Sequence, residues 1–600
     1  MRLLLILTVA LCSIVCALDT NQLVDMVRNK LGGVGALKSI NALELKGTVA
    51  VGKLSGSDDM TWSATGYFAA DVDLGTVKMK MGIDKNGAWM MDMNGGVTDV
   101  GGDQTADLQI MQLTTGWFCF RPDSGTKWEY LGDTSDGDHR LQMTLPVGSG
   151  LPAELIIDAK TKLPKQLIVK RGTENTITAY SDYRKVAGVM LPFHTEETGA
   201  GNLTISDEAE IKLLTNIDEN MFTRPQSREF YIMEGDKAVW NVTAFSKYLF
   251  IEGKVNGDGP YVFFVDTGAS NSVVDSALAD KLGIKKIGGM SGQAVGGNVE
   301  VDFATIDKLE LPGITLTGQV VALIPLKEAV GKYMPQLNIG GIIGYDVLSR
   351  FVIQMDYANS TLTLHRPKAF APLADMKFIP METSDGIISI KGVVEGRDLN
   401  MMIDTGSSSN IHFTTACVKR EKYLEDRKTA MSWWGGAAGL EEGRVGRIKS
   451  LEIAGFTMEN LVAEFAQAET GALGATGYDA NLGAGVLSRF DVVFDYPAHR
   501  LGLMPNARFA EQEEPDRMGI LVLPQKGSIK IVKMDPEGSA AKAGILVGDE
   551  IIKVDQSTIT ERSFMDLRNM FRKPAGTFLQ LTVKRNQKEI MIPVTLIDRF

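Results

Sequence analysis

Two stretches of the sequence end an apolar run with the same three residues, Asp-Thr-Gly. They read Tyr261-Val262-Phe263-Phe264-Val265-Asp266-Thr267-Gly268-Ala269-Ser270 and Leu399-Asn400-Met401-Met402-Ile403-Asp404-Thr405-Gly406-Ser407-Ser408. A surface carboxylate has no reason to follow a buried strand twice in this way, whereas two carboxylates that must meet in one site do. The repetition therefore predicts one active site that is assembled from two related lobes.

Two carboxylates in contact can hydrolyse a peptide bond without a metal or a covalent intermediate. One carboxylate deprotonates a water molecule, and the other, protonated, stabilises the oxyanion that develops on the substrate carbonyl. Because both groups cannot easily ionise, they share one proton, and their pKa values belong to the pair. We expect Asp266 and Asp404 to be catalytic, and the sequence leaves open which is the acid and which the base.

The residues after each aspartate suit a pair of catalytic loops. Thr267 and Thr405 are expected to lock the two loops together through hydrogen bonds. Gly268 and Gly406 allow a tight turn and a close approach of backbone.

The two motifs differ at their fourth residue. Ser407 is placed to hydrogen-bond the outer oxygen of Asp404 and favour its charged form, whereas Ala269 cannot do this for Asp266. We therefore expect the pair to titrate at a higher pH than a pair with serine in both places. Activity would then extend towards mildly acidic or neutral pH.

Residues 245–508 are duplicated. The two aspartates are 138 residues apart, and three other pairs of landmarks are each 139 residues apart. These pairs are Gly253 and Gly392, Ser349 and Ser488, and Asp356 and Asp495. A near-constant offset indicates two copies of a small β domain, since the repeat is far too long for a solenoid unit. We expect the first lobe at 245–370 and the second at 375–508.

With both motifs inside this frame, the block resembles an aspartic protease of the retropepsin-like kind, with two fused lobes. The resemblance implies an apolar-apolar-Gly phrase that packs behind each catalytic loop. The phrases read Ile342-Ile343-Gly344-Tyr345-Asp346 and Asn481-Leu482-Gly483-Ala484-Gly485. In the second phrase, the polar Asn481 stands where the family has an apolar residue, and Gly485 stands where the first phrase has Asp346. The second lobe therefore departs from the phrase that the family packs behind its catalytic loop.

The same family covers its substrate with a glycine-bearing hairpin flap. Candidate flaps are residues 292–297 and 433–439, each between its Asp-Thr-Gly and its closing phrase. Two interpretations of Trp433 and Trp434 stay open: they line substrate subsites, or they pack beneath the loop. His412 is expected to pack within the lobe and not to act in catalysis.

Residues 516–600 follow a polar linker that contains a proline. The segment Gly538-Ser539-Ala540-Ala541-Lys542-Ala543-Gly544, with the later Gly548-Asp549 turn, closely resembles a PDZ domain. The resemblance implies a peptide groove beside a helix over 563–571, with a C-terminal peptide as a possible ligand. It also implies a loop whose backbone N–H groups receive a chain-terminal carboxylate. That loop would be formed by Gly519, Ile520, Leu521 and Val522.

Residues 18–235 form the first block after the N-terminus. An amphipathic helix is predicted over 21–31, followed by short alternating strands that indicate a large, curved antiparallel sheet. Two later phrases, 155–164 and 180–192, resemble the outer-membrane lipoprotein-sorting fold, whose half-open barrel shelters an apolar ligand. Two roles stay open for this block: binding of a lipid-like ligand, and a structural or docking role.

The first residues carry one positive charge, Arg2, before an apolar run that ends in Val15-Cys16-Ala17. This pattern predicts a secretory signal peptide over 1–17. The alternative is an uncleaved anchor, but the run is shorter than the ~20 residues that a membrane span needs. The remaining cysteines, Cys119 and Cys417, lie in different predicted domains, so no disulfide framework is expected. We expect a secreted or periplasmic protein.

Composition argues against several classes of function. A formal charge of −12 over 600 residues argues against a nucleic-acid binder, which shows a basic face. There are five histidines and neither a His-Glu-x-x-His nor a Cys-x-x-Cys motif, so a zinc site is not indicated. Nothing in the sequence implies a metal or an organic cofactor. The lack of a Gly-x-Ser-x-Gly elbow argues against a serine hydrolase.

The sequence thus predicts a mainly β, multidomain chain. It would contain an N-terminal curved antiparallel half-barrel, a bilobal aspartic-protease β fold and a C-terminal α+β PDZ domain. The first hypothesis is an aspartic endopeptidase that acts on a peptide or protein substrate recruited by the PDZ domain. The second is a non-catalytic envelope binding or scaffold protein that acts through its PDZ and N-terminal domains. The third is a lipoprotein-handling carrier whose fused protease cuts only itself, at the linker between Glu511 and Arg517.

Overall fold

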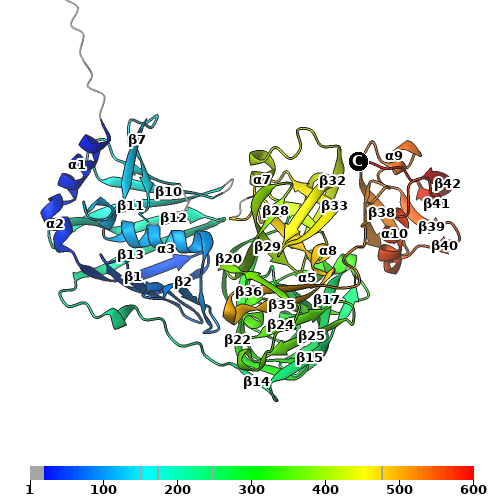
Figure 1. Ribbon diagram of the computed structural model, residues 1–600, viewed down its shortest axis with the longest axis horizontal. Helices are drawn as coiled ribbons and strands as arrows, with labels where there is room; N and C mark the ends of the chain where they lie inside the picture. Colours follow the sequence, from blue (N-terminus) through cyan, green and yellow to red (C-terminus); the bar gives the residue numbers. More distant parts are fainter. Residues whose placement is uncertain (1–18, 147–151, 172–173, 246, 475–476) are drawn as a thin grey trace, which may run out of the picture.

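The computed structural model describes residues 19–146, 152–171, 174–245, 247–474 and 477–600. Strands predominate and gather in three parts along the longest axis (Figure 1), coloured blue to cyan, green to yellow, and orange to red. The predicted mainly β, multidomain fold is therefore confirmed. The expected signal peptide, residues 1–17, lies outside the described residues. Within the described residues, no helix has both the length and the apolar character needed to cross a bilayer.

The N-terminal part is a curved antiparallel sheet covered by helices. Its strands are β1 Ala42–Val51, β2 Leu54–Ser63, β3 Phe68–Leu74, β4 Val77–Asp84, β5 Gly87–Met91, β6 Val97–Asp99, β7 Lys127–Asp133, β8 His139–Thr144, β9 Ala153–Ile157, β10 Pro164–Arg171, β11 Glu174–Val186, β12 Val189–Gly199 and β13 Asn202–Leu213. The helices are α1 Thr20–Leu31, α2 Gly33–Ser39 and α3 Gly102–Thr115. Consecutive strands pair along the chain, except that β6 and β7 form the two edges of the sheet, and β1 pairs with β13.

The helix predicted over 21–31 is observed as α1. It begins at a capping box, in which Asp19 accepts a hydrogen bond from the Gln22 N–H at 2.8 Å, and it ends at Gly32. The interior of this part is filled by a hydrophobic core rich in aromatic rings. Its largest buried side chains are Trp62, Phe68, Trp117, Phe118 and Phe120.

Each lobe of the central part has a sheet of its own. The first contains β14 Tyr231–Met233, β16 Thr243–Phe245, β17 Tyr248–Val255, β18 Asp258–Val265, β19 Val273–Asp275, β20 Lys286–Ala294, β21 Gly297–Leu311, β22 Ile314–Ile324 and β23 Ile339–Ile343. The second contains β27 Glu382–Ser384, β28 Ile387–Val394, β29 Arg397–Asp404, β30 Ile411–Phe413, β31 Thr429–Gly436, β32 Gly439–Ile453, β33 Phe456–Ala466 and β34 Ala480–Gly483. The short helices are α4 Ser276–Lys281, α5 Leu326–Ala329, α6 Tyr345–Leu348, α7 Thr415–Arg420 and α8 Ala484–Leu487.

A further sheet joins the two lobes. Its order is β15 Lys237–Asn241, β25 Thr361–His365, β24 Val352–Asp356, β35 Phe490–Asp495, β36 Arg500–Pro505 and β26 Lys377–Pro380. The lobes meet where β24 pairs with β35, with Met355 opposite Val492. Strands β14 and β15 precede residue 245, the expected start of the first lobe. They pair with strands of that lobe, and Trp240 of β15 is fully buried there.

The C-terminal part is a small sheet with two helices. Its elements are β37 Ile520–Gln525, β38 Ser528–Met534, α9 Ser539–Lys542, β39 Glu550–Val554, β40 Ser557–Thr558, α10 Phe564–Phe571, β41 Phe578–Arg585 and β42 Lys588–Thr595. The helix predicted over 563–571 is α10. Strand β37 stands at one edge, since β38 is its ladder partner among the described residues.

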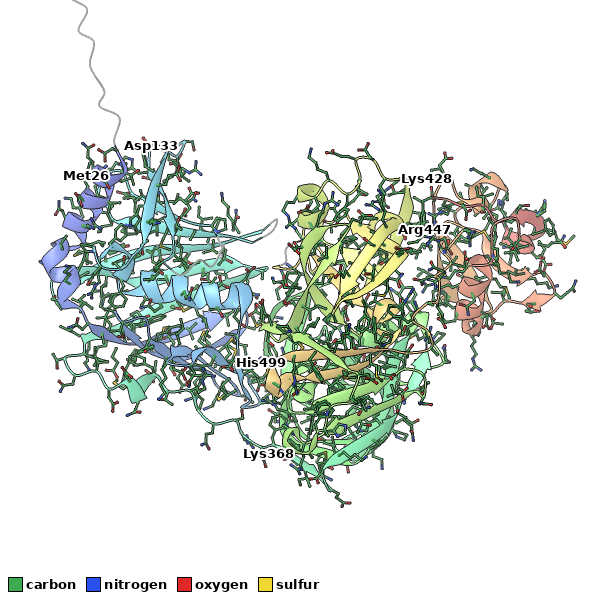
Figure 2. All side chains as sticks on the ribbon, in the orientation of Figure 1. Met26, Asp133, Lys368, Lys428, Arg447 and His499 are labelled. Atoms are coloured by element: carbon green, nitrogen blue, oxygen red, sulfur yellow. The ribbon has the colours of Figure 1, made fainter. Side chains whose placement is uncertain are left out.

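The central part contacts both flanking parts. His499 faces the N-terminal part (Figure 2), where its Nε2 lies 3.3 Å from Asp99 Oδ2. Arg447 lies on the opposite side, where its guanidinium donates to the Glu513 carbonyl at 3.5 Å. The central part therefore makes polar contacts with the N-terminal part on one side and with the linker to the C-terminal part on the other.

Candidate active site

The two Asp-Thr-Gly motifs come together between the lobes. Asp266 directly follows β18, and Asp404 ends β29; each of these strands runs parallel to the strand of its supporting phrase, β23 or β34. Asp266 Oδ1 accepts a hydrogen bond from the Gly268 N–H at 2.8 Å, and Asp404 Oδ1 accepts one from the Gly406 N–H at 2.7 Å. Each carboxylate is thus oriented by its own loop.

The two threonines bind the loops to each other. The Thr405 hydroxyl accepts from the Thr267 N–H at 3.0 Å and donates to the Val265 carbonyl at 2.8 Å. The Thr267 hydroxyl reciprocally accepts from the Thr405 N–H at 3.1 Å and donates to the Ile403 carbonyl at 2.9 Å. Both side chains are buried. The expected lock between the lobes is therefore present.

Glycine is required where each loop faces the opposite aspartate. A Cβ atom on Gly268 would lie 2.7 Å from Asp404 Oδ1, and one on Gly406 would lie 2.4 Å from Asp266 Oδ2. Any side chain at either position would push the two carboxylates apart.

The environment of the pair favours one shared proton. Burial, followed by the charge of Asp404, holds the pKa of Asp266 well above its usual range. Burial also raises the pKa of Asp404, but hydrogen bonds from Asn481 and from Asp266 oppose that rise. The hydrogen bond from Asn481 therefore favours the charged form of Asp404.

The hydrogen bond expected from Ser407 comes from another residue. The Ser407 hydroxyl accepts from the Ser409 N–H at 3.4 Å, whereas Asp404 Oδ2 accepts from Asn481 Nδ2 at 2.6 Å. The expectation for the Ser407 side chain was wrong because the loop turns that hydroxyl towards its own backbone. Asn481, which broke the family pattern, lies opposite Met402 on β29 and can reach the carboxylate.

The two loops are supported differently from behind. In the first lobe, Asp346 Oδ1 accepts from the Ser272 N–H at 2.8 Å and from its hydroxyl at 2.7 Å. In the second, Gly485 leaves room for Asn410, because a Cβ on that glycine would lie 2.6 Å from Asn410 Oδ1. Asn410 Nδ2 donates to the Val462 carbonyl at 3.0 Å. In the second lobe, the Asn410 side chain thus takes the supporting place that the aspartate has in the first lobe.

Two hairpins cover the pair, as expected of flaps. The first is β20–β21 and the second is β31–β32, and their tips touch where the Ala438 N–H donates to the Val295 carbonyl at 3.2 Å. Trp433 and Trp434 line the cavity below. The Trp434 ring also packs against buried His412, with ring centroids 4.3 Å apart and ring planes tilted by 50°. Trp434 thus packs within the lobe while it faces the cavity, its role in a substrate subsite stays a prediction, and His412 packs within the lobe.

Each flap is held by a flanking part of the chain. Asn202 of the N-terminal part binds Ser291 twice: its Nδ2 donates to the carbonyl at 2.8 Å, and its Oδ1 accepts from the N–H at 2.9 Å. In the C-terminal part, Lys533 forms an ion pair with Glu442 of the second flap at 3.1 Å. The hairpins above the aspartates are thus anchored from both ends of the molecule.

The N-terminal part also supports the first catalytic loop. Asn94 is buried; its Nδ2 donates to Asp346 Oδ2 at 3.1 Å, and its Oδ1 accepts from the Val320 N–H at 2.8 Å. Asp92 forms an ion pair with Arg350 beside it. The turn between β5 and β6, which carries Asp92 and Asn94, therefore docks directly behind the loop that carries Asp266.

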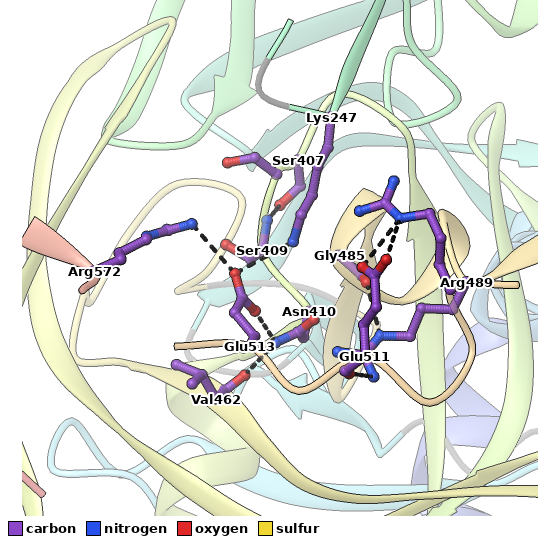
Figure 3. A network of polar contacts seen from close by, with 12 residues as sticks. Lys247, Ser407, Ser409, Asn410, Val462, Gly485, Arg489, Glu511, Glu513 and Arg572 are labelled. Atoms are coloured by element: carbon purple, nitrogen blue, oxygen red, sulfur yellow. Dashed lines mark hydrogen bonds and ion pairs between the residues drawn. The ribbon is translucent and has the colours of Figure 1, made fainter. Parts of the chain in front are cut away.

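The linker to the C-terminal part is bound to the second catalytic loop (Figure 3). Its Glu513 contacts Asn410, pairs with Lys247 at 3.2 Å and pairs with Arg572 of the C-terminal part at 3.4 Å. Arg489 donates to the carbonyl of Glu511 at 2.7 Å. These contacts fix the C-terminal part relative to the aspartates.

A cavity of about 1030 Å³ surrounds the pair. Its lining includes both aspartates, both flap tips and the predicted carboxylate-binding loop at residues 519–522. One donor of that loop is already in use, because the Gly519 N–H donates to Asp516 Oδ1 at 2.8 Å.

Comparisons with known proteins agree with this arrangement. Residues 251–347 and 390–484 each match the family model described as aspartyl protease, and residues 516–596 match the model of the PDZ domain. A carboxy-terminal-processing protease of Bartonella bacilliformis (strain ATCC 35685 / KC583 / Herrer 020/F12,63) is 38% identical over 68 residues. That match covers 11% of this chain and 16% of the length of that curated relative.

Two solved structures have a low similarity to this chain. A DUF1329 family protein from Desulfovibrio piger ATCC 29098 is 11% identical with a TM-score of 0.26, over 34% of this chain and 97% of that one. Basic 7S globulin from soybean is 11% identical with a TM-score of 0.28, over 46% of this chain and 97% of that one. At these TM-scores, neither similarity is evidence for a shared fold or function.

Proposed function

We propose that this chain, which carries a retropepsin-like aspartyl-protease domain in two repeats and a C-terminal PDZ domain, is an aspartic endopeptidase. One observation supports this proposal most strongly: Asp266 and Asp404 face each other between lobes that are locked by reciprocal threonine hydrogen bonds. The lock holds the buried carboxyl of Asp404 and the half-buried carboxyl of Asp266 in contact, which is the arrangement that water-mediated peptide hydrolysis requires.

The proposed reaction uses a water molecule between the two carboxyls. Asp404, ionised and stabilised by Asn481, takes a proton from the water as the oxygen attacks the scissile carbonyl carbon. Asp266 gives its proton to the carbonyl oxygen, so that a neutral tetrahedral diol forms. The diol then collapses: Asp404 gives its proton to the amide nitrogen, Asp266 takes a proton from a diol hydroxyl, and the C–N bond breaks, which restores the starting protonation of the pair. The flaps exclude bulk water, which strengthens each polar interaction inside.

The flanking domains have supporting roles in this proposal. The PDZ domain recruits a peptide or protein substrate through its groove. The contacts of Asn94 and Asn202 favour a docking role for the N-terminal domain, and a lipid-like ligand for that domain stays a prediction. The predicted signal peptide supports a secreted or periplasmic location.

The test is cleavage of a mixed peptide library over a pH series, with products identified by mass spectrometry. The negative control is the double variant Asp266→Asn/Asp404→Asn. The matched substitution control is Asp398→Asn, which changes an exposed residue on the same strand as Asp404, β29. We expect the wild type and Asp398→Asn to cut and the double variant to be inert. If the wild type cuts nothing at any pH, the proposal is wrong and a non-catalytic binding or scaffold role is favoured.

A further inference from the structure

The N-terminal part forms one wall of the cavity that holds the catalytic pair. The lining includes Met79 of β4, Met90 of β5, Thr98 of β6 and Val100, which follows β6. Both catalytic aspartates line the same cavity. A peptide that lies across the aspartates can therefore touch the N-terminal part. We call Met79, Met90 and Val100 the methionine wall.

The methionine wall belongs to one face of the N-terminal sheet. In the pairing of β4 with β5, Met81 lies opposite Met90, and Met79 stands two residues before Met81. Met90 in turn lies opposite Thr98 of β6. Because opposite residues, and alternate residues along a strand, share a face, these side chains point to the same side of the sheet. Met81 packs against the hydrophobic core of the N-terminal part, so this wall continues that core towards the aspartates.

The carboxylate on this wall is already paired within the protein. Asp92 directly follows β5 and also lines the cavity. It accepts hydrogen bonds from the N–H groups of Asn94 and Gly96 at 2.9 Å each, and it forms an ion pair with Arg350. What β4 and β5 offer to a ligand on this face are half-buried thioether chains. Such chains are unbranched and turn about three bonds, so they adapt to apolar groups of different shape.

The wall is held in a fixed place relative to the first catalytic loop. Gln104 of α3 binds Asp385 of the second lobe twice: its Nε2 donates to Oδ1 at 2.9 Å, and its Oε1 accepts from the N–H at 2.8 Å. The carbonyl of Asp385 accepts from the Ser270 hydroxyl at 2.7 Å, in the loop that follows Asp266. Gln104 also contacts the sulfur of Met90. A side chain bound at the wall would therefore lie at a constant separation from the aspartates.

Apolar surface continues from the N-terminal part to the first flap. Met93 of the N-terminal part and Met290 of β20 pack against one hydrophobic cluster, and both line the cavity. That cluster includes Phe264 of β18, the strand that leads to Asp266, and Phe303 of β21. The cleft is thus apolar on both sides of the junction between the N-terminal part and the first lobe.

We propose that the methionine wall is a substrate subsite of the protease. It selects a large apolar side chain, such as that of leucine, methionine or phenylalanine, at one position of the peptide. Since the wall is tied to the loop of Asp266, that position stands a constant number of residues from the bond that is cut. The N-terminal domain is then part of the substrate-binding machinery. This inference rests on the proposed function.

The test is a series of peptides built on one cleaved sequence, in which each position in turn carries Leu, Asp or Lys. The readouts are kcat/KM and the position of the cut. The enzymes are the wild type, Met79→Glu and Met90→Lys, which place opposite charges on the wall. The matched controls are Met111→Glu and Met111→Lys, which change an exposed methionine on α3 of the same domain.

At one position, we expect the wild type to favour Leu over Asp and over Lys by about tenfold or more, because burial of a large apolar side chain is favourable. At that position, Met79→Glu should favour Lys over Asp, and Met90→Lys should favour Asp over Lys, each by about tenfold or more, since charges attract strongly in a partly dry cleft. Both Met111 variants should behave as the wild type. Unchanged preferences in both wall variants would overturn the inference and leave the proposed function standing. A wild-type preference for a charged residue at the position that these variants alter would also overturn it.

Photocrosslinking tests the inference without turnover and without a substitution in the wall. The same peptide carries a photoactivatable leucine analogue at each position in turn and is bound to the double variant Asp266→Asn/Asp404→Asn, and the crosslinked residues are identified by mass spectrometry. We expect one peptide position to crosslink to residues 79–100. Absence of crosslinks to this segment from every position contradicts the inference. Crosslinks to the segment, with no cleavage of any peptide by the wild type, contradict the proposed function alone.

Discussion

Asn481 donates its side-chain amide to Asp404 at 2.6 Å, whereas the equivalent residue of the first lobe, Ile342, is apolar. The two halves of a nearly symmetric site thus differ in one hydrogen bond. That bond lowers the cost of ionising Asp404, while Asp266 is left with burial and the charge of its partner. On the basis of this asymmetry, we propose Asp404 as the base and Asp266 as the acid.

The first prediction concerns the variant Asn481→Ile, which copies the first lobe. Losing a hydrogen bond to a charged group removes about 1.5–3 kcal/mol, so the pKa of Asp404 rises by about one unit or more. A higher pH is then needed to ionise it. The acid limb of kcat/KM against pH should move upward by that amount, and Ile342→Val should leave the limb in place. An unmoved acid limb in Asn481→Ile would contradict the assignment.

The second prediction concerns the lock between the lobes. Thr405→Val keeps the shape of the side chain but leaves the Thr267 N–H and the Val265 carbonyl without their partner. Each unpaired buried group costs about 1–3 kcal/mol. We expect kcat to fall at least about tenfold and the melting temperature to drop, whereas Thr405→Ser should behave nearly as the wild type. Full activity of the valine variant would show that the lock does not position the carboxylates.

The third prediction concerns the first flap. Asn202→Ala removes two hydrogen bonds to Ser291. Hydrogen exchange of amides in 286–300 should then become roughly fivefold faster or more, because a net loss near 1 kcal/mol raises the open population by that factor. The control Asn220→Ala lies in an exposed turn of the N-terminal part. Exchange that is equally slow in both variants would mean that other contacts hold this flap.

The fourth prediction concerns the buried Asp58 and the half-buried Glu208 of the N-terminal part. Asp58 and Glu208 lie on either side of Gly47, whose Cβ position is 2.9 Å from an oxygen of each. Burial and the charge of Asp58 raise the pKa of Glu208 to about 8. The folded state thus binds a proton that the unfolded chain releases near pH 4.5. Stability should therefore fall as the pH rises from about 5 to 8.

Calorimetry of the wild type and Glu208→Gln at pH 5 and pH 8 tests this pH dependence. The wild type should melt at a lower temperature at pH 8, and the glutamine variant should lose much of that difference. A melting temperature that rises with pH in the wild type would show that Glu208 is ionised in the folded protein.

The meeting of the two Asp-Thr-Gly motifs could be predicted from the sequence because its signal is local and repeated. Asp266 and Asp404 each carry their strand, their threonine and their glycine beside them, and the offset between them marks the two lobes. The flaps and the PDZ helix were found for the same reason. In each case, neighbours in sequence are also neighbours in structure.

Contacts between distant segments could not be predicted. Asn481 looked like a break in a pattern, since its role depends on the register of β34 against β29. Ser407 was assigned that role because sequence does not show which way a hydroxyl turns. The docking of Asn94 behind Asp346 joins residues 252 positions apart, and no local pattern marks it. Such partners depend on how the domains pack.

The central claim is that one site is shared by two lobes, and single substitutions test it most directly. The initial rate of cleavage of one good peptide is measured for the wild type, Asp266→Asn, Asp404→Asn and the control Asp398→Asn, at the optimal pH. We predict that each dyad substitution alone lowers kcat by at least about a thousandfold with the melting temperature little changed, because neither carboxyl can act without the other. A variant of either aspartate that keeps near wild-type kcat would contradict the shared site.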